Sequence, residues 1–231
     1  MIDFSRFEEK TGITFKDKGL LRQAFTHRSF INENKSEGTG HNERLEFLGD
    51  AVLELIVTEA LYGMYKEKSE GVLTAYRAAL VNANTLSVVG ANLSLNDYLL
   101  LSKGESKDIG RARQYILANT MEAVIGALYL DGGYEKATEF VKRHIMPLIE
   151  GILEKGGIID SKSFFQEKAQ ENEGITPSYK VLKETGPDHD KHFIVGVYLE
   201  RALVASGEGN SKQDAEQDAA REGLKKRGWE S

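Results

Sequence analysis

The chain has 231 residues, of which 40% are hydrophobic and 29% charged, a balance typical of folded globular proteins. It contains no cysteine, which excludes a disulfide framework, a thiolate nucleophile and a cysteine-based zinc site. The formal net charge of −6 argues against a generally basic nucleic-acid-binding protein, although phosphate contacts depend on where the charges lie rather than on their sum.

No apolar run reaches the roughly 18 residues that a membrane-spanning helix needs. The N-terminal segment MIDFSRFEEKTG also lacks the apolar core of a signal peptide. From these two features we expect a cytoplasmic protein without a membrane partner.

Residues 1–153 are predicted to form an all-α domain. Apolar residues recur there at spacings of three and four, and short segments rich in Gly, Asn, Ser and Lys separate the helical stretches. The helices are expected at 18–30, 42–64, 71–92, 114–130 and 134–154.

A second, smaller domain is predicted after a linker at 154–159, where two glycines interrupt the helical pattern. Residues 160–229 have the order α-β-β-β-α, because two helical segments enclose three segments rich in β-branched and aromatic residues. The predicted fold class is therefore an all-α domain followed by a small α+β domain. Its helices are expected at 161–172 and 211–227, and its strands from 177, at 192–200 and at 202–206.

Three carboxylates lie on one stripe of the helix predicted at 42–64. Glu43, Glu46 and Asp50 are spaced i, i+3, i+7, so they share a face. Like charges at this spacing repel by a few tenths of a kcal/mol per pair, and a bound cation would reverse that effect. The alternative interpretation is an acidic face that is simply solvated.

A fourth carboxylate, Glu122, lies on a segment that is apolar almost all round, as a buried helix would be. Asn119 precedes it by three residues. A buried carboxylate needs a partner, and a divalent cation shared with Glu46 and Asp50 would supply one. Oxygen ligands without a His or Cys cluster favour Mg²⁺ or Mn²⁺. The alternative is an ion pair between Glu122 and an arginine, either Arg44 or Arg77.

The segment HNERLEFLGDAVLE, at 41–54, resembles the defining motif of the ribonuclease III family. Further matches follow in order at 26–29, 70–71, 76–81 and 116–126, so the resemblance covers almost the whole chain. It implies a homodimeric, Mg²⁺-dependent endonuclease of double-stranded RNA, in which Mn²⁺ can substitute and no nucleotide cofactor takes part. The implied products carry 5′-phosphate and 3′-hydroxyl ends with short 3′ overhangs, and the implied role is the processing of ribosomal and messenger RNA.

The same resemblance implies roles for individual residues. Asp50 and Glu122 correspond to the catalytic carboxylates, and Glu46, Asn119 and Glu122 to metal ligands. Glu43 and Glu70 occupy accessory acidic positions, and Phe47 corresponds to a residue that contacts the partner subunit of the dimer.

Asn119 departs from the family pattern, which has an aspartate at this position. An amide oxygen can still coordinate Mg²⁺, but it brings no charge, so weaker metal binding is expected. This departure leaves an alternative function open, a double-stranded-RNA-binding protein whose cleavage is impaired. The retention of Glu43, Glu46, Asp50, Glu70 and Glu122 favours an active enzyme instead.

The second domain resembles the double-stranded-RNA-binding domain. Gln166 and Glu167 on its first helix and His189 in a loop between strands could reach 2′-hydroxyl groups in the minor groove. Ser211 and Lys212 open the last helix, where a lysine can meet phosphates. The alternative is an α/β module that binds protein.

Overall fold

The structure is a computed structural model that describes residues 3–35, 40–154, 161–187 and 191–229. It divides into two compact units, the first made of residues 1–66 and 76–155 and the second of residues 67–75 and 156–231. The predicted linker at 154–159 lies almost wholly outside the described residues, so the domain limits 1–153 and 160–229 stay predictions. Among the described residues, no helix combines the length and the apolar character that crossing a membrane requires.

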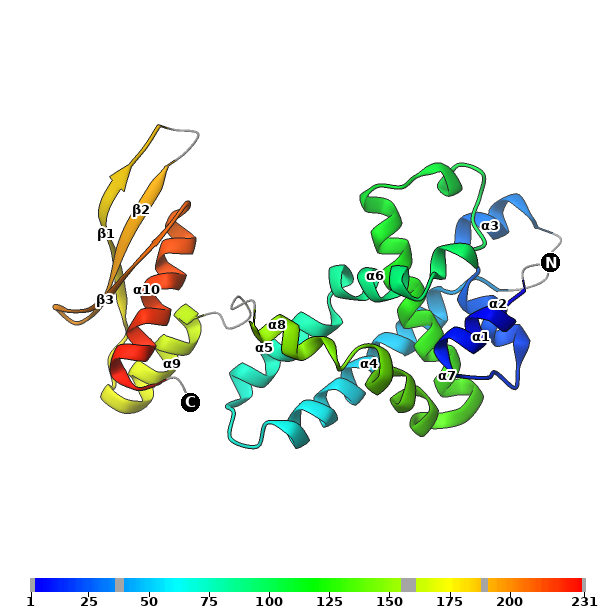
Figure 1. The fold of residues 1–231 in the computed structure, drawn as a ribbon, viewed down its shortest axis with the longest axis horizontal. Helices are drawn as coiled ribbons and strands as arrows, with labels where there is room; N and C mark the ends of the chain where they lie inside the picture. Colours follow the sequence, from blue (N-terminus) through cyan, green and yellow to red (C-terminus); the bar gives the residue numbers. More distant parts are fainter. Residues whose placement is uncertain (1–2, 36–39, 155–160, 188–190, 230–231) are drawn as a thin grey trace. The chain divides into compact units, whose positions relative to one another are not determined.

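The N-terminal part is helical, as predicted, and Figure 1 shows its helices in chain order. Two 3₁₀ turns, Leu95–Asp97 and Glu105–Lys107, interrupt the connection between α6 and α7. The helices are α1 (Ser5–Thr11), α2 (Lys18–Ala24), α3 (Arg28–Glu33), α4 (Glu43–Met64), α5 (Glu70–Val81), α6 (Ala83–Asn92), α7 (Arg111–His144) and α8 (Leu148–Glu154).

Three of the predicted helices are divided in the structure. The stretch 134–154 is interrupted by a turn at 145–147, which separates α7 from α8. The stretch 18–30 breaks between α2 and α3 because Thr26 forms an isolated parallel bridge with Leu100, a contact that the local pattern does not reveal. The stretch 71–92 breaks at Asn82, whose side chain accepts a hydrogen bond from the Thr85 amide at 2.9 Å and so caps α6. The separation predicted near 130–134 is a kink inside α7 at Gly133, where φ is +80°.

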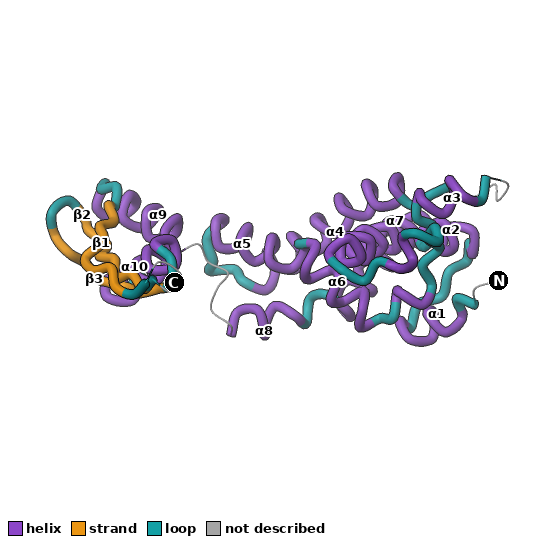
Figure 2. Tube along the Cα trace, turned by 90° about the horizontal axis from the view of Figure 1, so that it is seen from above, coloured by secondary structure: helices purple, strands orange, loops and turns teal. Residues whose placement is uncertain are grey.

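Helix α7 is the centre of the first unit, and in Figures 1 and 2 it runs among the other helices. Helices α2, α4 and α6 all pack against it, α4 most extensively. Its middle is buried on every side, as the all-round apolar pattern of 115–130 predicted. The fully buried residues of this stretch include Ala123, Val124, Ile125, Ala127 and Leu128.

Helices α4 and α7 cross with their backbones in close contact, and two glycines permit this approach. A Cβ atom on Gly49 of α4 would overlap the carbonyl oxygen of Glu122. A Cβ atom on Gly126 of α7 would overlap the carbonyl oxygen of Leu45. Any larger residue at either position would push the helices apart, so both positions require glycine.

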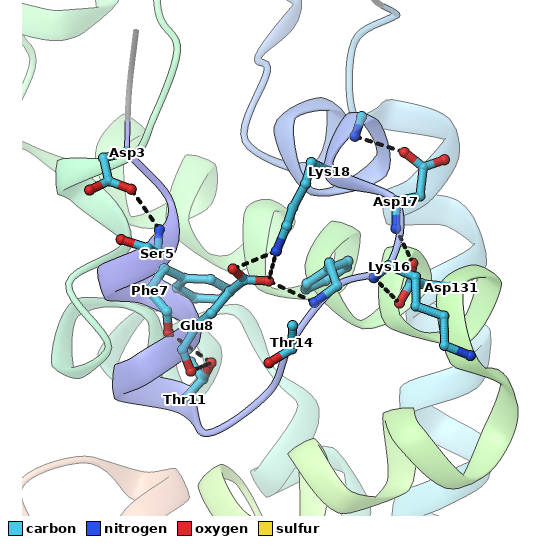
Figure 3. A network of polar contacts seen from close by, with 12 residues as sticks. Asp3, Ser5, Phe7, Glu8, Thr11, Thr14, Lys16, Asp17, Lys18 and Asp131 are labelled. Atoms are coloured by element: carbon cyan, nitrogen blue, oxygen red, sulfur yellow. Dashed lines mark hydrogen bonds and ion pairs between the residues drawn. The ribbon is translucent and has the colours of Figure 1, made fainter.

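A polar network fastens the N-terminal segment to the turn after the buried part of α7 (Figure 3). The Asp131 carboxylate accepts hydrogen bonds from the backbone amides of Lys16 (3.0 Å) and Asp17 (2.7 Å) and from Lys136. Burial alone would raise the pKa of Asp131, but the hydrogen bonds from Lys136, Asp17 and Lys16 outweigh it and lower the pKa to about 2. The network therefore stabilises the packing of the N-terminal segment at neutral pH.

The second unit contains an antiparallel sheet with strand order β1-β2-β3 and two helices, which confirms the predicted α-β-β-β-α order. Its inward-facing residues Val195 and Val197 are completely buried, and α10 packs on β2 and β3 through small residues such as Ala219. β3 is longer than predicted because its pairing with β2 continues to Gly209. The elements are α9 (Ser161–Glu173), β1 (Ser178–Thr185), β2 (His192–Leu199), β3 (Ala202–Gly209) and α10 (Lys212–Arg227).

The crossing of α4 and α7 makes a direct prediction. Gly49→Ala should lower the free energy of unfolding by about 2 kcal/mol or more, because the new methyl group has no space at the crossing. The matched control is Gly63→Ala on the same helix, where no heavy atom lies within 4 Å of the new Cβ. This variant should gain roughly 0.5–1 kcal/mol from better helix propensity. Urea denaturation measures both, and equal effects of the two substitutions would contradict the close crossing.

Candidate active site

The close crossing brings the predicted carboxylates of α4 and α7 together. Glu46 and Asp50 both act electrostatically on Glu122, and the side-chain amide of Asn119 hydrogen-bonds to Glu46. Two residues of α4 and two residues of α7, which are about 70 positions apart along the chain, thus form one site. We call Glu46, Asp50 and Glu122 the carboxylate cluster.

Burial and mutual repulsion disfavour the ionised form of two carboxyl groups in the carboxylate cluster. Burial, followed by the charges of Asp50 and Glu46, raises the pKa of Glu122 from 4.5 to about 7. Burial and the charges of Glu43 and Asp50 also raise the pKa of Glu46, while the hydrogen bond from Asn119 opposes this shift. The site therefore resists full ionisation near neutral pH unless a cation joins it.

The structure does not show the alternative ion pair between Glu122 and an arginine. Arg77 donates instead to Thr58 Oγ1 at 3.0 Å. Within the described ranges, no basic side chain forms an ion pair with any member of the carboxylate cluster. Three carboxyl groups and one amide oxygen without a cationic partner are a donor set that suits a hard divalent cation.

The described side chains are not arranged as a metal-binding site. No group of three His, Cys, Asp or Glu side chains among them is placed to hold a metal ion. The metal-ligand roles of Glu46, Asn119 and Glu122 therefore stay predictions.

Glu43 lies at the edge of the site, where two basic side chains approach it. Its carboxylate is 3.4 Å from Arg28 Nη1 and 3.7 Å from His41 Nδ1, while its charge still raises the pKa of Glu46. Glu70 begins α5 and accepts a hydrogen bond from Thr74 Oγ1 at 3.0 Å. The accessory roles of both glutamates stay predictions.

Sequence reasoning did not place the 101–110 segment beside this edge of the site. The Ser102 amide donates to Ser29 Oγ at 3.0 Å, and the charges of Glu105 and Glu43 both act on His27. Burial outweighs these two charges and lowers the pKa of His27. The match at 26–29 was the only signal for this region, and it carried no information about residues 101–110.

Arg113 holds the 101–110 segment in shape. Its guanidinium donates to the carbonyl oxygens of Asp108 (3.0 Å) and Glu105 (2.7 Å). One arginine therefore closes the segment against the first turn of α7.

Phe47 is displayed on the surface although it lies between cluster residues in the sequence. Its side chain is 82% exposed, and Leu55 and Tyr62 on the same helix are 58% and 75% exposed. Their spacings of eight and seven residues place all three within one sector of α4. We call Phe47, Leu55 and Tyr62 the α4 stripe. Several large apolar side chains exposed on one side of a helix are a feature of interaction surfaces.

Most of the predicted RNA-binding residues of the second unit are exposed to solvent. Gln166 and Glu167 are exposed on α9, and Lys212 is exposed at the first position of α10. His189 lies outside the described residues. Ser211 caps α10, since its Oγ accepts from the Asp214 amide at 3.1 Å. This confirms the expected helix start, whereas the RNA contacts stay predictions.

Comparisons with known proteins agree with both units. The family described as Ribonuclease-III-like matches residues 17–149, and the Double-stranded RNA binding motif matches residues 161–227. Ribonuclease 3 of Borreliella burgdorferi is 43% identical over 221 residues, which cover 96% of this chain and 90% of that protein. Ribonuclease 3 of Bacillus cereus strain G9842 is 46% identical over 224 residues, which cover 96% of this chain and 91% of that protein.

A solved structure resembles the helical unit. The nuclease domain of ribonuclease III from Campylobacter jejuni matches with a TM-score of 0.57 and 39% identity. The match covers 63% of this chain and 97% of that chain. That domain is described as having structural flexibility in a region involved in dimer formation.

The raised pKa of Glu122 predicts how stability depends on pH without metal. The folded-state pKa lies above the ordinary value of 4.5, so stability falls as the pH rises from about 4.5 through about 7. In EDTA, Glu122→Gln should therefore be more stable than the wild type at pH 8, by roughly 2 kcal/mol, and nearly equal to it at pH 4.5. Urea denaturation at the two pH values measures this difference.

The control for this comparison is Glu135→Gln, which changes an exposed glutamate on the same helix. This variant should show the same small difference from the wild type at both pH values. A pH-independent effect of Glu122→Gln would contradict the proposed origin of the pKa shift.

Proposed function

The chain belongs to the ribonuclease III family, and on that premise we propose that it is a Mg²⁺-dependent endonuclease of double-stranded RNA. It hydrolyses phosphodiester bonds to leave 5′-phosphate and 3′-hydroxyl ends with short 3′ overhangs, in the processing of ribosomal and messenger RNA in the cytoplasm. The observation that carries this proposal is the meeting of Glu46, Asp50 and Glu122 at the α4–α7 crossing, without a basic partner in the described part of the chain.

Glu46, Asn119 and Glu122 are the residues that would hold Mg²⁺, for which Mn²⁺ can substitute. When bound, the cation supplies a water of lowered pKa and neutralises charge that develops on the phosphate. Glu122 binds a cation only as a carboxylate, and its pKa is about 7. Protons should therefore compete with the cation, so the Mg²⁺ concentration needed for half-maximal cleavage should rise as the pH falls below 7.

The chain's own residues position the reacting groups. Asp50 is exposed one helical turn beyond Glu46, so its carboxylate can accept a hydrogen bond from the attacking water. Glu122 is half-buried on rigid α7, which fixes its carboxylate relative to Asp50. No covalent nucleophile is required, since the attacking group is water.

The second unit is proposed to bind the duplex. Gln166 and Glu167 on α9 and His189 in the loop would hydrogen-bond 2′-hydroxyl groups of successive minor grooves, and Lys212 would contact the phosphates between them. Ser211 contributes through the start of α10, which it caps. Recognition would follow the A-form shape of the duplex more than its sequence.

The α4 stripe supports a homodimer. Phe47 is almost fully exposed, and a two-fold axis at the stripe would bury it against a second copy of the same surface. The active-site residues Glu46 and Asp50 lie on the same helix, so dimer formation would place them next to the partner subunit. In the proposed dimer, the active site of each subunit would therefore lie close to the subunit interface.

The function is tested with an end-labelled RNA duplex in a titration of Mg²⁺, with EDTA as the control and a gel shift on the same samples. The wild type should cut the duplex to short products with 5′-phosphates only when metal is present. Glu122→Gln should lose at least about 1,000-fold in rate, because it removes a ligand charge, and should still bind RNA. Cleavage by this variant at the wild-type rate would overturn the assignment of Glu122.

The Asn119→Asp variant is measured in the same Mg²⁺ titration of RNA cleavage. The added charge should move the midpoint to lower Mg²⁺, and an unchanged midpoint would mean that residue 119 is not a ligand. Binding without cleavage by the wild type at every Mg²⁺ and Mn²⁺ concentration would leave the alternative function, an RNA-binding protein with impaired cleavage.

The homodimer is tested by sedimentation equilibrium. Phe47→Glu should shift the wild-type dimer towards monomer by at least tenfold in dissociation constant, because it places a charge in the apolar interface. Ile109→Glu is the control, since Ile109 is also exposed (92%) but lies outside α4. A monomeric wild type, or equal effects of both substitutions, would contradict the proposed interface.

A further inference from the structure

The sheet of the second unit is covered by helices on one face. Figures 1 and 2 show α9 and α10 on the same side of the three strands. Val195 and Val197 of β2 point towards these helices and are completely buried. Side chains alternate along a strand, so Ile194, Gly196 and Tyr198 point to the opposite side. We call that side of the sheet the outer face.

The centre of the outer face is apolar. Leu182 of β1 is 47% exposed and Leu203 of β3 is 50% exposed. Three side chains fill the space over Gly196, since a Cβ atom there would lie 2.7 Å from Leu203, 3.0 Å from Tyr198 and 3.2 Å from Leu182. These side chains form a contiguous apolar patch, which is a feature of interaction surfaces.

The two edges of the outer face carry opposite charges in one row. Lys183 of β1 is the partner of Ile194 on one side of β2, and Glu208 of β3 is its partner on the other side. Both charged residues are exposed. Glu208 Oε2 lies 3.7 Å from His192 Nε2, whereas Lys183 has no carboxylate partner within the described segments. The row therefore runs from a cation at β1 to an anion at β3.

This arrangement makes the outer face complementary to itself. A two-fold axis parallel to β2 turns β1 of one copy over β3 of the other. Lys183 of each copy then faces Glu208 of the other, and the two apolar centres meet. The resulting layers resemble an ordinary pair of aligned sheets about 10 Å apart. The helices lie on the far sides, so α9 and the start of α10 stay accessible.

The size of the outer face sets the strength of such a contact. Three strands of eight residues, about 4.8 Å apart and with about 3.3 Å per residue, make a face of roughly 400 Å². Stable interfaces bury about 800 Å² per partner. Association through this face alone should therefore be weak. Two copies already joined through the α4 stripe meet at an effective concentration on the order of 1 mM, which suits a weak contact.

We propose that the outer face of the second unit docks on the outer face of a second copy of this chain. The apolar centres and two Lys183–Glu208 ion pairs form the contact. The RNA-binding surfaces proposed above would then point in opposite directions, so one assembly engages two duplex segments. That consequence rests on the proposed function, whereas the docking itself does not.

The first test uses the absence of cysteine, which makes an introduced thiol a unique label. Ile194 lies on the central strand beside the axis, whereas Gln170 is exposed on α9. The full chain at about 1 mM is treated with a short bis-maleimide, because packed sheets are about 10 Å apart and beyond the reach of a disulfide. Ile194→Cys should give at least about fivefold more cross-linked pairs than Gln170→Cys. Equal yields would overturn the proposal, including the case in which another protein covers the face.

The second test reverses the charges in the Ile194→Cys chain. Lys183→Glu and Glu208→Lys should each lower the yield at least about threefold, because the axis brings like charges together twice. The combination of both substitutions should restore the yield. The control is Lys226→Glu, which makes the same charge change at an exposed position of α10 and should have no effect. A combined variant that stays as low as the single ones would overturn the ion pairs.

The outer-face contact can be told apart from the α4 stripe and from the nuclease activity. With Phe47→Glu added, the cross-link through Ile194→Cys should persist at about 1 mM, and its loss would overturn a contact made by the outer faces themselves. None of these measurements requires RNA cleavage. A protein that never cuts RNA would therefore refute the endonuclease and leave the result on the outer face intact.

Discussion

The rest of the molecule depends on the contact between the backbones of α4 and α7. Gly49 and Gly126 let each helix touch a carbonyl oxygen of the other, so two long helices lie closer than ordinary side chains would allow. The carboxylates within one turn of these glycines are thereby brought close enough to act on one another electrostatically. The charge pattern of the candidate active site is thus a direct result of steric packing.

This packing makes the site electrostatically unfavourable by itself. Glu122 and Glu46 are held where burial and like charges raise their pKa values, and no described basic side chain compensates them. The rigid core of α7 tolerates this because its apolar residues provide stability elsewhere. A divalent cation would relieve the repulsion, so metal binding and the ionisation of Glu122 are coupled. Asn119 moderates the repulsion, since it adds a hydrogen bond to Glu46 instead of a fourth charge.

In the proposed function, the two units divide RNA recognition and chemistry between them. The second unit offers exposed polar groups on α9 and at the capped start of α10, which suit the regular shape of a duplex. The first unit holds the carboxylate cluster, and Arg113 shapes the segment that leads into α7. The overall charge of −6 is compatible with RNA as the partner because the few cations that matter are placed locally.

The sequence alone determined the helical character of the first unit and the α-β-β-β-α order of the second, because apolar spacing and the capping residue Ser211 are local signals. It also predicted that Glu46, Asp50 and Glu122 share one site, since a carboxylate on an apolar helix needs a partner and the motif at 41–54 is long. The structure brings these three residues close enough to interact electrostatically. It could not foresee the division of 18–30 by the Thr26–Leu100 bridge, because strand-like pairing between distant residues leaves no local period. Nor could it foresee the 101–110 segment beside His27. Only the tertiary structure decided these features, because they arise where helices from distant parts of the chain pack against one another.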